Sequence, residues 1–184
     1  MERDADSYRP LARALHWATA ALIALQFAFG LIMVHDAPEP NLWATLAERF
    51  QLYDSHKVLG IALFALVLVR LANRAISGAP GALPEVPAWQ RAAATLGHVA
   101  LYLLLVAVPL LGWLGISLYP ALQVFGTASL PSLAAPDRAA SETVLFWHGI
   151  AAFALVGLAL GHAGAALHHH FVRRDRTLRR MLGR

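Results

Sequence analysis

Four long apolar segments dominate the chain and restrict what it can fold into. They cover residues 15–34, 56–76, 96–118 and 143–167, and each has about 20 residues or more, which is enough to cross a bilayer. All eleven acidic residues lie outside these segments or at their borders. Only 14% of the residues are charged, against about a quarter in soluble domains. The sequence therefore predicts an all-α membrane protein, a four-helix bundle in one domain over residues 1–184.

The basic residues give the expected orientation of these helices. Twelve of the fifteen Lys and Arg residues lie in the N-terminal segment, the second connection and the tail at 171–184, and three (Arg49, Lys57, Arg138) lie in the first and third connections. By the positive-inside rule, both termini are expected in the cytoplasm. The basic tail is expected to meet anionic lipid rather than nucleic acid. The segment 42–50 is expected to be amphipathic and to lie on the outer membrane surface, and the proline-containing third connection to form an outer cap.

Two histidines share one face of the fourth segment. His148 and His162 are fourteen residues apart, close to four helical turns and about 21 Å along the axis. A bilayer core is about 30 Å thick, so one imidazole is expected near each side. With the predicted orientation, His16 lies at the depth of His162 on the cytoplasmic side, and His56 lies at the depth of His148 on the outer side. The sequence thus predicts two imidazoles from different helices at each of two levels.

Paired imidazoles within an apolar bundle favour haem over other metals. The chain has no cysteine, which excludes thiolate ligands, iron–sulfur clusters and covalent c-type haem. Zinc would require a third or fourth ligand, and the apolar segments contain no carboxylate. Two neutral imidazoles satisfy both axial positions of a haem and favour one-electron transfer. Gly30 and Gly60 are expected either to let a macrocycle approach the backbone or to allow close helix packing.

Several motifs resemble the bacterial cytochrome b561 family. They are LARALHW at 11–17, SHKVLG and LVRL within 55–71, LGHVALYLLLVAVPLLGW at 96–113, and FWHG with GHAGAALHHHFVRRDRTLRRML within 146–182. The resemblance covers all four helices and the tail, and is strongest to the members that pass electrons from superoxide to ubiquinone. It implies two b haems in the bacterial inner membrane, with His16 and His162 holding the inner haem and His56 and His148 the outer one.

His98 and His169 fit neither pair. Both are expected on the cytoplasmic side, where quinone reduction needs protons and hydrogen-bond donors, so they are candidates for a quinone site or proton relay. Interfacial anchoring and hydrogen bonds to haem propionates are the alternatives. Arg13, Arg70 and Arg74 could likewise pair with propionates, although they also fit as topology residues.

The expected function is electron transfer from superoxide at the outer face to ubiquinone. One alternative is a membrane-anchoring subunit that passes electrons between a periplasmic redox protein and the quinone pool. A third interpretation is a non-redox bundle whose histidines only join helices by hydrogen bonds, and a colourless purified protein would favour it. The sequence leaves the electron donor and the oligomeric state open.

Overall fold

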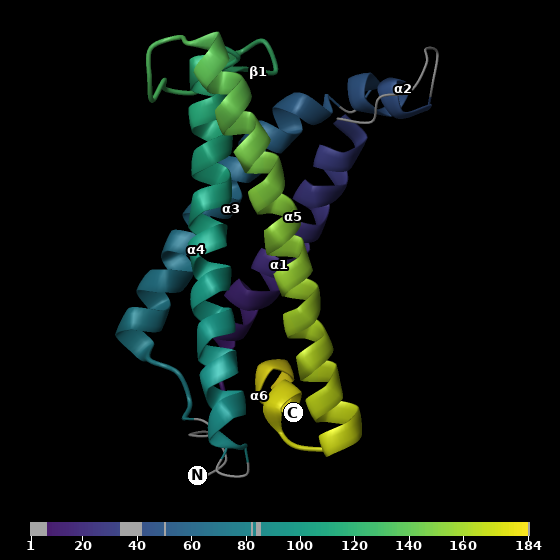
Figure 1. Cartoon of the computed structure of the whole chain (residues 1–184), viewed down its shortest axis with the longest axis vertical. Helices are drawn as coiled ribbons and strands as arrows, with labels where there is room; N and C mark the ends of the chain where they lie inside the picture. The colour runs from purple at the N-terminus through teal and green to yellow at the C-terminus, as the bar shows by residue number, and fades with distance from the viewer. Residues whose placement is uncertain (1–6, 34–41, 50, 82, 84–85, 184) are drawn as a thin grey trace.

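The fold is that of a helical bundle, seen here in a computed structural model that describes residues 7–33, 42–49, 51–81, 83 and 86–183 (Figure 1). Four long helices run between its two ends: α1 (Pro10–Met33), α3 (Leu52–Ser77), α4 (Ala88–Leu118) and α5 (Arg138–His168). All four are long and apolar enough to cross a membrane. The predicted four-helix membrane fold is confirmed.

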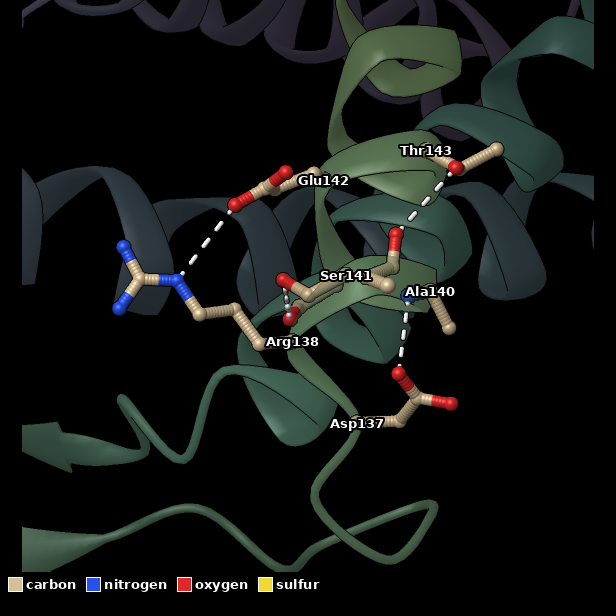
Figure 2. A network of polar contacts seen from close by, with 8 residues as sticks. Asp137, Arg138, Ala140, Ser141, Glu142 and Thr143 are labelled. Atoms are coloured by element: carbon tan, nitrogen blue, oxygen red, sulfur yellow. Dashed lines mark hydrogen bonds and ion pairs between the residues drawn. The ribbon is translucent and has the colours of Figure 1, made fainter.

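The helices extend beyond the predicted apolar segments because polar turns continue them. α4 begins directly after Pro87, eight residues before the apolar run. α5 begins after Asp137, whose carboxylate accepts a hydrogen bond from the Ala140 backbone N–H at 3.0 Å (Figure 2). Such an N-cap satisfies one of the free N–H groups of the first turn and typically contributes about 1 kcal/mol. Hydropathy marks the part of a helix in lipid, whereas caps mark where it begins.

The helices pack unevenly around a small core. α4 lies closely along α5 and α1 along α3, whereas α1 and α5 approach each other at few positions. The core consists of Leu63, Val67, Leu105 and Leu155. Buried residues make up only 6–17% of the most apolar stretch of each spanning helix, so few apolar side chains are fully enclosed within the bundle.

One end of the bundle, here called the hairpin end, carries α2 (Leu42–Arg49) and a hairpin of β1 (Gln123–Val124) and β2 (Ala128–Ser129) (Figure 1). Asp54 accepts a hydrogen bond from the Phe125 backbone N–H at 2.7 Å. Lys57 forms an ion pair with Asp54 at 2.7 Å and donates to the carbonyls of Ala121 and Gln123. These contacts hold the hairpin, which forms part of the third connection, against the start of α3.

The opposite end is here called the α6 end. After His168 the chain forms a π-helical turn, η1 (His169–Arg173), and a short helix, α6 (Thr177–Leu182), which returns to the bundle. The Trp17 indole donates to the Met181 carbonyl at 3.3 Å, and the Arg180 guanidinium donates to the Gly81 carbonyl at 2.9 Å. Arg180 is 8% exposed, so the tail includes a buried cation beside its surface ones. Arg3 and residues 34–41 of the first connection lie outside the described residues.

Candidate functional site

Two histidine rings face each other toward the α6 end. His16 comes from α1 and His162 from α5, and their ring centres are 6.2 Å apart with an angle of 60° between the planes. Trp17 stacks edge-on against His16 at 5.1 Å. Arg70, on α3, places a guanidinium nitrogen 2.9 Å from His16 Nδ1. Because arginine only donates hydrogen bonds, Nδ1 is the acceptor in this arrangement and the ring proton is on Nε2.

A second pair lies toward the hairpin end. His56 from α3 and His148 from α5 have ring centres 6.2 Å apart and nearly perpendicular planes, at 84°. His148 Nδ1 lies 2.9 Å from the Val108 carbonyl on α4 and donates its proton there. That contact places the neutral ring's lone pair on Nε2. A Cβ at Gly112, one turn after Val108, would be 3.0 Å from the His148 ring, so this glycine makes room for the imidazole.

The spacing within both pairs suits a single metal ion between two imidazoles. A metal–nitrogen bond is about 2 Å and the ring centre lies about 1.1 Å behind the nitrogen, so two axial ligands have ring centres about 6.3 Å apart. Both observed separations are 6.2 Å. Within the described part of the chain, no group of three or more His, Cys, Asp or Glu side chains could hold a metal ion. Each facing pair supplies two imidazoles, the number that a bis-histidine haem would need.

The other two candidate histidines occupy separate surroundings. The His98 ring, on α4, contacts the His162 ring at 5.2 Å. His169 instead contacts the Asp175 carboxylate and the His168 ring. Burial raises the pKa of Asp175, but hydrogen bonds from His169 and Thr177 outweigh it and hold that pKa below its usual value. No hydrogen bond or ring contact joins His98 to His169 among the residues that the structure describes.

The glycines and Gln26 show what sequence reasoning found and missed. Gly30 faces the hairpin-end pair, because its Cβ would be 3.7 Å from the His56 ring. Gly60 instead makes room for Gln26, whose amide nitrogen would be 3.1 Å from a Cβ there. Gln26 donates to the His56 backbone carbonyl at 3.0 Å. A carboxamide within an apolar segment is itself a signal of function in the membrane. The role of Gly112 could not be predicted in this way, because the sequence does not show which glycine of α4 contacts a histidine of another helix.

The fold and the paired histidines define a class of protein: a four-span membrane helix bundle with two pairs of facing histidines in its interior. The family model of prokaryotic cytochrome b561 matches residues 7–184. This chain belongs to the prokaryotic cytochrome b561 family, whose members are b-type membrane electron-transfer proteins.

Three relatives illustrate the range of the similarity. Cytochrome b561 homolog 2 of Escherichia coli (strain K12) is 35% identical over 97% of this chain and 93% of its own length. Cytochrome b562 of Cereibacter sphaeroides is 33% identical over 95% of this chain and 94% of its own length. A Yersinia pestis protein named Probable superoxide oxidase CybB is 28% identical, over 69% of this chain and 72% of its own length.

Proposed function

We propose that this chain binds two b haems and carries single electrons across the bacterial inner membrane. The observation that supports it is the pair of 6.2 Å ring separations, His16 with His162 and His56 with His148. α5 supplies one histidine to each pair, so a single helix links the two sites. When bound between these histidines, each haem would supply a one-electron redox couple.

The orientation follows from the arginines. The α6 end carries the basic tail, so it faces the cytoplasm and its haem is the inner one; the hairpin end faces the periplasm and its haem is the outer one. If His16 held a haem through Nε2, its ring proton would lie on Nδ1, and the Arg70 guanidinium, which also only donates, would turn away from that nitrogen. The released guanidinium is suited to pair with a haem propionate.

Superoxide is the proposed donor and ubiquinone the acceptor. Two superoxide anions become two molecules of dioxygen, and one ubiquinone takes up the two electrons with two protons to become ubiquinol. The support is the resemblance to superoxide-oxidising members and the similarity to the Yersinia pestis protein. The local charge gives little further support for superoxide as donor, because Lys57 and Arg138 at the hairpin end are each paired with a carboxylate. His98, beside His162, is the proposed proton donor or quinone contact, while His169, also proposed for that role, would have to leave Asp175.

The haem content of the purified protein tests the first part of this proposal. Reduced-minus-oxidised spectra with haem-to-protein stoichiometry should give two haems per chain. Alanine at His56 or His148 should remove the outer haem, and alanine at His16 or His162 the inner one. The matched control is His168→Ala. His168 is exposed and lies on α5, the helix of His148 and His162, and its replacement should leave both haems in place. One haem per chain, or none, would contradict the two-site proposal.

The donor requires a separate test. Stopped-flow mixing with superoxide should reduce the haems at a near diffusion-limited rate, and added ubiquinone should then reoxidise them. Slow reduction would instead favour a periplasmic redox protein as donor. The exposed aromatic side chains Tyr53, Tyr119 and Phe125 at the hairpin end favour this second candidate, since aromatic residues are enriched at protein interfaces.

A further inference from the structure

Gln26 occupies an unusual position on α1. It lies within the apolar span, and its side-chain N–H group donates to the His56 backbone carbonyl at 3.0 Å. Its carbonyl oxygen, Oε1, is buried and has no hydrogen-bond partner. An unpaired buried acceptor is destabilising, and lipid offers no water to compensate. The side chain is therefore held beside His56 with its acceptor unused.

The His56 ring likewise has a nitrogen without a hydrogen-bond partner. Its Nδ1 is buried and also has no hydrogen-bond partner. By contrast, Nδ1 of His148, on the other side of the same site, is satisfied by the Val108 carbonyl. A histidine that binds metal through Nε2 carries its proton on Nδ1 and almost always donates it to an acceptor. Of the two rings facing each other, only His56 lacks that acceptor in the described structure.

We propose that Gln26 is the positioning residue of His56, with Oε1 accepting the Nδ1 proton when Nε2 binds the outer haem iron. This rests on the proposed haem ligation. The carboxamide already lies beside His56 through its bond to the backbone carbonyl, and a turn of the side chain would bring Oε1 toward the ring. The last torsion of glutamine is broad, which makes that rotation inexpensive. Gly60 permits this, because a side chain there would press on the Gln26 amide.

An acceptor on the Nδ1 proton makes the imidazole a stronger electron donor and stabilises oxidised iron. Replacing Gln26 by Met keeps the length of the side chain but removes the acceptor. One hydrogen bond contributes up to about 1.5 kcal/mol, so the equilibrium should shift toward reduced outer haem by up to about tenfold. For one electron, tenfold corresponds to about 59 mV. The inner haem of the same molecule serves as the internal reference.

The test is a potentiometric titration of wild type, Gln26→Met and Gln26→Glu, with haem stoichiometry measured on each sample. We expect Met to raise the outer midpoint potential and Glu, which keeps an acceptor oxygen, not to raise it. In reduced Gln26→Met, the nitrogen chemical shift of His56 Nδ1 should differ from that of the wild type, whereas the nitrogen shifts of the inner ligands should not. If Met removes the outer haem and Glu retains it, the acceptor role is supported.

Two outcomes would overturn the inference. One is an unchanged outer potential and NMR shift in Gln26→Met with two haems bound. The other is loss of the outer haem in both variants, which would mean that Gln26 acts only through its bond to the His56 backbone. Either result leaves the haem proposal intact, whereas wild-type protein with fewer than two haems would contradict the haem proposal itself.

Discussion

The approach of His148 to α4 makes Gly112→Ala the most direct test of the hairpin-end site. The new methyl group would lie 3.0 Å from Cε1 and 3.1 Å from Nδ1 of His148, about 0.4 Å closer than the 3.4 Å at which ordinary contact begins. The imidazole must move away from α4. That movement stretches its 2.9 Å hydrogen bond to the Val108 carbonyl and carries the ring off the axis it shares with His56.

The expected loss follows from these contacts. Overfilling a packed site typically costs about 1–3 kcal/mol, and the Val108 hydrogen bond contributes about 1 kcal/mol of the same total. Outer haem affinity should therefore fall about 5- to 150-fold. The helix itself should not weaken, because alanine exceeds glycine in helix propensity by about 1 kcal/mol.

Gly97→Ala on the same helix is the matched control. It brings the same gain in propensity, but no atom lies within 4 Å of the added Cβ. The measurement is the rate at which each haem passes to an excess of a haem-scavenging apoprotein, followed by absorbance. We expect faster loss of the outer haem in Gly112→Ala alone. Equal rates in the two variants would refute the argument that Gly112 seats the His148 ring.

Three further predictions concern other parts of the chain. Ser141→Ala removes a fully buried hydrogen bond to the α4 backbone (3.0 Å); it should cost about 1 kcal/mol and lower Tm by about 2–4 °C with both haems retained. The pKa of Asp175 is lowered on folding, so its stabilisation of the tail is present at neutral pH and lost as pH falls through the folded pKa; the protection of the α6 amides, relative to their intrinsic exchange rates, should decrease in acid, and Asp175→Asn should remove that dependence. Arg70→Leu removes a cation beside His16 and should lower the inner haem potential in a redox titration, leaving the outer one unchanged.

The spanning helices and the histidine pairing were predictable because each depends on a one-dimensional property. A lipid-spanning helix needs a run of apolar residues, and helix rise converts the spacing of His148 and His162 into depth. The hairpin was not predicted. It forms because Asp54 and Lys57 capture backbone groups of the third connection, and those contacts link segments more than sixty residues apart.

The neighbours of the histidines were harder to predict than the histidines. His98 could be placed on the α6 side from its position in the third segment, but its contact with His162 depends on the rotation of α4 about its own axis. Gly60 illustrates the same point, since only the packing of α1 on α3 decides that it faces Gln26. The depth of a residue in the membrane follows from its position along one helix. The side chain that it contacts depends on how two helices are rotated relative to each other.

The two proposed haem sites differ in the polar groups beside their ligands, and this difference gives electron transfer a direction. At the hairpin end, His148 donates to a backbone carbonyl, which strengthens the ligand and stabilises oxidised iron. At the α6 end, the permanent cation Arg70, turned from His16 toward a haem propionate as proposed, would stabilise the reduced state, which carries one positive charge fewer. The outer haem should thus have the lower potential, and electrons entering at the hairpin end pass downhill toward His162 and His98. A redox titration that gave the haem of His16 and His162 the lower potential would contradict this direction.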